Sequence, residues 1–113
     1  MKTVFAAVTL ALCGQAFAAD GNYIATLADA HDRALQGRGT TADGVDAGKL
    51  VGFVIAVTDD STLMQVVCLP SGVTYEQLVE VAKKSTREKP DQWHLPGHLL
   101  VQMALMKSFP CKK

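Results

Sequence analysis

The stretch LVGFVIAV at residues 50–57 decides the fold, because it holds eight consecutive residues without a polar side chain. A helix that is apolar on every face lies at the centre of its domain, so we expect this one to pack on several sides. Valine and isoleucine also favour strands, which makes a buried β-strand the alternative. The flanking sequences DAGK and TDDSTLMQ favour a helix over residues 47–67, with Asp46 as its N-cap. Gly52 and Ala56 lie one turn apart, so another backbone can approach closely there.

Three further helices are expected around this one. Residues 22–36 carry apolar side chains three and four positions apart, which indicates an amphipathic helix, and the glycine-rich stretch 37–44 is predicted to be a mobile loop. Residues 74–88 begin with a T-x-x-Q capping box, and their charged residues, Lys83 among them, are predicted on the solvent face. A proline at position 96 suits the first turn of a fourth helix. The predicted fold class is all-α, a small bundle of about four helices.

The N-terminus resembles a secretory signal peptide. Met1-Lys2 is a short positive start, an apolar segment follows, and Ala16-Phe17-Ala18 is an A-x-A cleavage site. We therefore expect residues 1–18 to be removed and residues 19–113 to form one domain in the periplasm. The alternative is a buried N-terminal helix, and a lipid anchor is disfavoured because a leucine precedes Cys13.

Two cysteines, Cys68 and Cys111, remain after that cleavage. In an oxidising compartment two cysteines most simply form one disulfide, which we predict here. A reactive pair or an intermolecular bridge is the alternative, although the C-x-x-C spacing of redox motifs is missing.

The composition excludes several classes of function. Formal net charge is zero, so a nucleic-acid partner is not expected, and no apolar run reaches the roughly 18–20 residues of a membrane span. His94 and His98 have a zinc-ligand spacing, but a proline between them separates them from a common helix. Asp59 and Asp60 are adjacent and point apart on a helix. We therefore expect no enzyme, no cofactor and no metal site.

The C-terminal two-thirds resembles the Tai-type immunity family, which neutralises peptidoglycan amidase toxins of type VI secretion. GFVIAVTD at residues 52–59 is similar to the G-Y-I-x-G-x-x-D segment of that family, and CLPSGVT at 68–74 to its C-x-P-x-G-V-T element. The Leu95-Pro96 start of the last helix and the F-P-C ending at 109–111 also fit. A second cysteine pair found in many members is missing here, and the N-terminal third shows no such similarity.

This resemblance implies a small periplasmic immunity protein, a homodimer, that occludes the active site of a cognate papain-like peptidoglycan amidase. Exposed loops are the expected contact surfaces. The candidate partner-binding residues are Asp59, Asp60, Asp91, Trp93 and His94. For Trp93, capping of the core is the alternative to a partner contact.

Two other functions stay open. A periplasmic acid-stress chaperone of the HdeA type is also small, helical, dimeric and disulfide-bonded, and it opens at low pH. A family member that has lost its toxin partner would keep the same sequence motifs.

Overall fold

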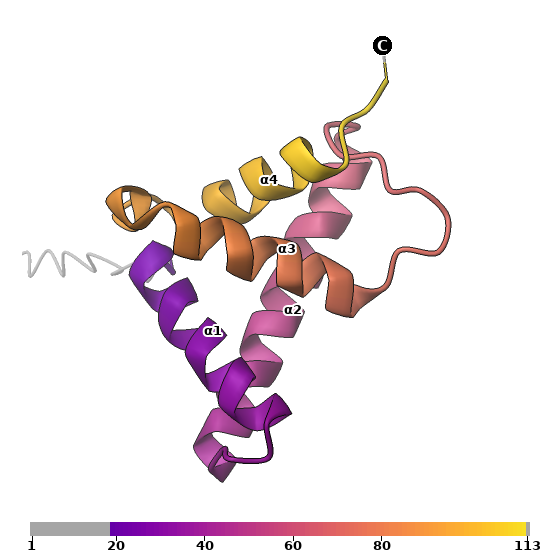
Figure 1. Cartoon of the computed structure of the whole chain (residues 1–113). Helices are drawn as coiled ribbons and strands as arrows, with labels where there is room; N and C mark the ends of the chain where they lie inside the picture. Colours follow the sequence, from indigo (N-terminus) through magenta and orange to yellow (C-terminus); the bar gives the residue numbers. More distant parts are fainter. Residues whose placement is uncertain (1–18, 113) are drawn as a thin grey trace, which may run out of the picture.

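The computed structural model describes residues 19–112, so the predicted signal peptide lies outside the described residues. Within this range the chain forms four α-helices, which confirms the all-α prediction (Figure 1). They are α1 (Gly21–Leu35), α2 (Thr41–Leu63), α3 (Tyr75–Glu88) and α4 (Gly97–Ser108), with a short 3-10 turn, η1 (Pro90–Gln92), before α4. In Figure 1, α1 and α2 meet at their connecting turn and diverge from it, and α3 and α4 lie across the open end. None of these helices combines the length and the hydropathy that crossing a bilayer requires.

The core is built from one face of each helix. Ile24 and Leu27 of α1, Leu50 and Val54 of α2 and Leu105 of α4 are fully buried, and α3 adds its own apolar stripe. All fully buried large side chains lie between residues 24 and 105. Among the described residues the core therefore lies within this range.

The second helix begins six residues earlier than the sequence analysis predicted. Thr40, not Asp46, is the N-cap: its side chain accepts from the Asp43 backbone, and the Asp43 carboxylate accepts from the Thr40 backbone. This reciprocal pair is a capping box, and residues 41–44, half of the predicted loop 37–44, are therefore helical. The helix ends at Leu63 rather than residue 67, because Gln65 has a positive φ of 59°. By contrast, the capping box at the start of α3 lies where it was predicted.

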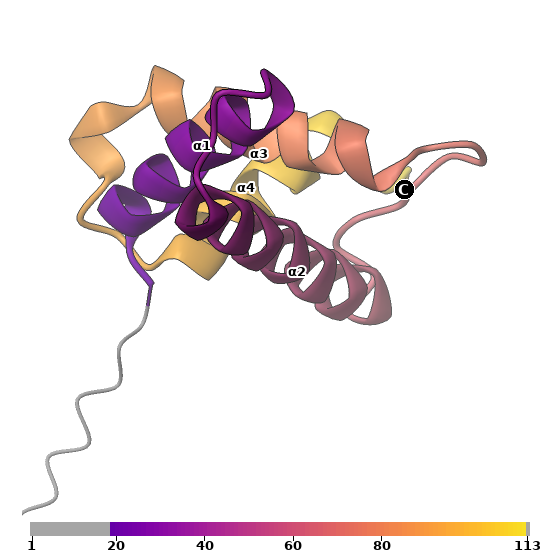
Figure 2. The same cartoon turned by 90° about the horizontal axis from the view of Figure 1, so that it is seen from below.

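The central position of α2 is confirmed only in part. This helix contacts each of the other three, and Leu50, Val54 and Val57 are buried among them. Gly52 and Ala56, where a close backbone approach was expected, face outward instead. A Cβ atom built at Gly52 meets no atom within 4 Å. Figure 2 shows α2 along one edge of the molecule, so its outer face has no neighbour among the described residues.

Close packing at the start of α1 depends on two glycines. A Cβ atom at Gly21 would lie 2.5 Å from the Trp93 Cα atom, and one at Gly97 would lie 2.6 Å from the Ala19 carbonyl oxygen. The Gly21 N–H donates to the Leu95 carbonyl at 3.1 Å. The start of α1 and the turn before α4 therefore touch through their backbones, which no larger residue would allow.

The predicted disulfide between Cys68 and Cys111 is present, with the two Cα atoms 4.9 Å apart. The Cys68 N–H also donates to the Phe109 carbonyl at 3.0 Å. Together these contacts fix the end of the chain to the connection between α2 and α3.

Candidate functional site

The five predicted partner-binding residues lie in two separate places. Asp59 and Asp60 are exposed on the last turns of α2, while Asp91, Trp93 and His94 lie in and after η1, between α3 and α4. In Figure 1 these two regions are at different corners of the molecule. The structure therefore offers two candidate contact patches rather than one combined site.

Asp60 lies at the edge of a shallow groove between α2 and α4. The groove has a volume of about 250 Å³, and Phe53, Ala56 and Val57 supply its apolar lining. His98 and Gln102 of α4 form the opposite wall. An apolar floor with an acidic rim is suited to an aliphatic side chain that ends in a positive charge.

Trp93 is half-buried and fixes the connection between α3 and α4. Its indole N–H donates to the Thr86 carbonyl at 2.7 Å. Its own carbonyl accepts from the backbone and the side-chain amide of Asn22, each at 3.2 Å. These contacts hold η1 against both α3 and α1, which agrees with the core-capping alternative for this residue. Asp91 and His94, on either side of it, are exposed and free to meet a partner.

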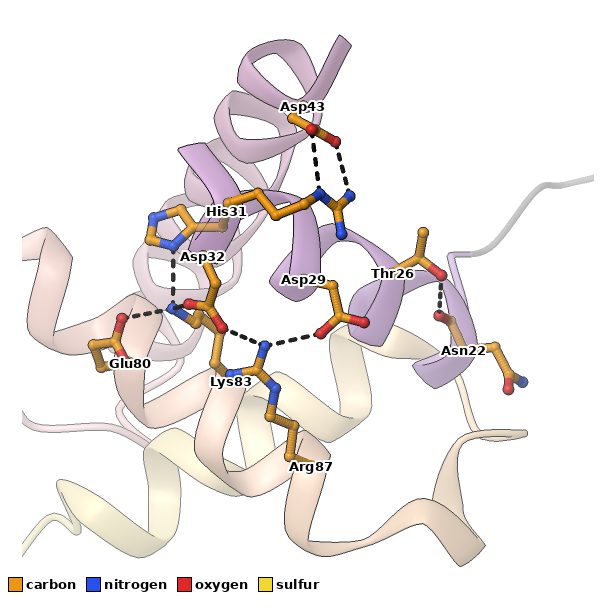
Figure 3. A network of polar contacts seen from close by, with 10 residues as sticks. Asn22, Thr26, Asp29, His31, Asp32, Asp43, Glu80, Lys83 and Arg87 are labelled. Atoms are coloured by element: carbon orange, nitrogen blue, oxygen red, sulfur yellow. Dashed lines mark hydrogen bonds and ion pairs between the residues drawn. The ribbon is translucent and has the colours of Figure 1, made fainter. Parts of the chain in front are cut away.

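The most densely connected polar group of the described chain joins α1 to α3 (Figure 3). The Lys83 ammonium donates to Asp32 Oδ1 at 2.5 Å, to Glu80 Oε1 at 2.7 Å and to His31 Nδ1 at 3.1 Å. The Arg87 guanidinium donates to Asp32 Oδ2 at 2.6 Å and to Asp29 Oδ1 at 3.0 Å, so it bridges these two carboxylates. An ammonium can only donate, so His31 accepts through Nδ1 and carries its proton on Nε2.

Lys83 is only 2% exposed, so its predicted place on the solvent face is wrong. Lys83 is charged, and the other charged residues of α3 were predicted on the solvent face with it, so the sequence alone gave no sign of its burial. Its burial follows from α1, which covers this side of α3 and supplies two of the three acceptors.

The cluster shifts the acid–base behaviour of two groups on α1. The hydrogen bond from Lys83 lowers the pKa of Asp32, and the Arg87 hydrogen bond adds to this. Burial lowers the pKa of His31, and the nearby Lys83 charge lowers it further. Both shifts favour the protonation states that the Lys83 contacts require, namely an ionised Asp32 and a neutral His31.

Within residues 19–112, His31, Asp32 and Glu80 are the side chains close enough to share a metal ion. Lys83 already donates to all three, so its ammonium stands where a cation would sit. The arrangement joins α1 and α3 by charge.

A family model for Rap1a immunity proteins matches residues 10–111. The chain belongs to the Rap1a immunity protein family. No curated protein and no solved structure matches it. The Rap1a match extends well beyond residues 52–111, which carried the resemblance described above, and it includes α1 and the start of α2. Membership of the Rap1a family gives the chain a general role in type VI secretion immunity, by binding a cognate effector.

Proposed function

We propose that this protein is a periplasmic immunity protein of the Tai type, which inhibits a cognate peptidoglycan amidase effector by occluding its active site. The Rap1a family match over residues 10–111 carries the proposal. The apparent signal peptide at residues 1–18 supports the periplasm, where peptidoglycan is exposed to such effectors. The chain needs no catalysis for this role, because a rigid surface that releases its partner slowly is sufficient.

Contact through exposed parts of the chain fits this role. Asp91 lies in η1 and His94 two residues after it, both exposed, and the Trp93 hydrogen bonds hold this turn against α3 and α1. A rigid, exposed turn can enter the cleft of an enzyme without a large loss of conformational entropy. We assign the effector contact to this turn, and we also propose the homodimer that the family resemblance implies.

The test begins with affinity capture at neutral pH. The oxidised chain, residues 19–113, is tagged and exposed to a lysate of its own strain in which type VI secretion is induced. A captured protein is then purified, and its hydrolysis of isolated peptidoglycan is measured with and without the chain. Stoichiometric inhibition of an amidase is the expected result.

Paired variants test the contact surface. Asp91→Ala with His94→Ala should weaken inhibition at least about tenfold, whereas the exposed control Lys84→Ala should not. Inhibition that is equal in both variants removes the turn from the contact surface. A failure to capture any amidase favours a member that has lost its partner, and protection of client proteins from aggregation at low pH favours the acid-stress chaperone.

A further inference from the structure

The disulfide between Cys68 and Cys111 lies at the surface of the protein. Cys68 is exposed and Cys111 is half-buried, and both line a surface hollow of about 720 Å³. Val67, the residue before Cys68, is only 1% exposed and belongs to the core, so the backbone beside the exposed cysteine is held in place. A disulfide that solvent reaches is open to attack by a thiolate in the folded state, whereas a disulfide inside a core is reached only after unfolding.

This disulfide holds a short segment after α4, residues 109–112. Besides the S–S bond, the segment is attached to the α2–α3 connection by the Phe109 carbonyl, which accepts from the Cys68 N–H at 3.0 Å. The Phe109 side chain is partly buried against the core. Figure 1 shows this last stretch of chain leaving α4 beside the end of α2. The fully buried large side chains all lie between residues 24 and 105 of the described chain, so release of the segment removes none of them.

We propose that Cys68 is a site of thiol–disulfide exchange in the folded protein, through which a dithiol reductant releases residues 109–112 from the α2–α3 connection. The thiolate of the reductant attacks Cys68 Sγ, forms a mixed disulfide there and expels Cys111 as a thiolate. The second thiol of the reductant then breaks the mixed disulfide. Two electrons and two protons pass to the chain, which ends with two thiols, and the reductant ends as a disulfide. A protein with a C-x-x-C dithiol has this chemistry.

The surroundings favour attack at Cys68 over attack at Cys111. Cys68 is the more exposed of the two, so its sulfur is the easier to approach. Lys112 lines the same hollow, next to Cys111, and its positive charge stabilises the thiolate that leaves. No carboxylate among the described residues lines the hollow, so an approaching thiolate meets no like charge there.

The rate of reduction by dithiothreitol tests whether the disulfide opens in the folded protein. The oxidised chain is reduced in increasing urea, below the unfolding transition. We expect the rate constant to change by less than about twofold, because exchange in the folded state does not require unfolding. A rate that rises in proportion to the unfolded fraction overturns the proposal.

Glutathione identifies the sulfur that is attacked. The folded chain is treated with glutathione, the freed thiol is blocked with N-ethylmaleimide, and mass spectrometry of the digested chain locates the mixed disulfide. We expect at least about tenfold more glutathione on Cys68 than on Cys111, since access decides which sulfur reacts. Equal amounts on the two cysteines, or more on Cys111, overturn the assignment to Cys68.

Lysine variants test the leaving group. Lys112→Ala should slow the reduction about threefold and Lys112→Arg should restore the rate, because the charge beside Cys111 is removed and then returned. Lys107→Ala, on α4 and outside the hollow, makes the same charge change and should leave the rate as it is. Equal rates in Lys112→Ala and Lys107→Ala overturn the departure of Cys111 beside Lys112.

Hydrogen exchange tests the release of the segment. In the reduced chain the Cys68 amide should exchange at least about tenfold faster, because its acceptor on Phe109 departs, while helical circular dichroism stays unchanged. The Asp43 amide, held by the Thr40 cap at the far end of α2, is the control and should not change. Loss of the helical signal on reduction, or an unchanged Cys68 amide, overturns the release.

Discussion

Lys83 is a charged residue that the fold uses as a core residue. Its aliphatic stem passes through the α1–α3 contact, and its ammonium is satisfied by Asp32, Glu80 and His31. A buried charge is tolerated only where its hydrogen bonds are complete. Asp32 and Glu80 are themselves partly exposed, so water screens the ion pairs and limits their contribution to stability.

Replacing Lys83 by methionine keeps the stem and removes the charge. We expect the free energy of unfolding to fall by about 1–2 kcal/mol, because Asp32 Oδ1 and His31 Nδ1 lose their donor. Lys84→Met, at a side chain that is 78% exposed, is the matched control and should change it by less than about 0.5 kcal/mol. Urea unfolding of both variants measures the difference. Equal stability of the two would show that the buried ammonium contributes nothing.

At the scale of the elements, the start of α2 depends on its cap. Its first turn contains Gly44, a poor helix former, and the start is set by the capping box of Thr40 and Asp43. Arg33 of α1 donates to both oxygens of Asp43, at 2.8 and 3.2 Å, so the cap also joins two helices. The Arg33 hydrogen bonds and those from the Thr40 backbone lower the pKa of Asp43 to about 2.

The Thr40 cap gives a prediction at the scale of this helix. Thr40→Ala removes the side chain that accepts from the Asp43 backbone, and we expect it to destabilise the protein by about 1 kcal/mol. Hydrogen exchange of the Asp43 and Gly44 amides should quicken, because the first turn frays. Thr41→Ala, one residue further on, removes no cap and serves as the control. If both variants unfold at the same urea concentration, the cap does not set the start of α2.

At the scale of the whole molecule, three ionisable groups each make the stability fall as the pH falls. His31 has a lowered pKa, so the unfolded chain takes up its proton first and stability falls as the pH drops below 6.5. Asp32 and Asp43 also have lowered pKa values, so their contribution is complete above pH 3.8 and is lost as the pH falls below it. Two of these groups lie on α1, which suggests that acid weakens the attachment of this helix first.

We therefore expect the urea midpoint to decline in two stages on acidification. His31→Gln should remove the first stage, just below pH 6.5, and leave the second. His94→Gln, at an exposed residue in the turn before α4, is the control and should keep the wild-type profile. A midpoint that is constant down to the range in which carboxylates titrate would contradict the assignment of the first stage to His31.

What the sequence by itself determined were features with short-range causes. The capping box at Thr74 started α3 where predicted, because its hydrogen bonds join residues only three positions apart. The pairing of Cys68 with Cys111 followed from their being the two cysteines left after residue 18. The start of α2 was equally readable from Thr40 and Asp43, but the three glycines of residues 37–44 suggested a loop.

Only the tertiary structure decided which side of each helix packs against another helix. Lys83 is buried, and Gly52 is open, because of where α1 and α4 lie, not because of any neighbour in sequence. The need for glycine at 21 and 97 likewise arises between segments far apart along the chain. Local hydrogen bonds act within one helical turn and can be read from sequence. Burial and the shape of a contact surface depend on the mutual placement of all four helices, which only the folded chain fixes.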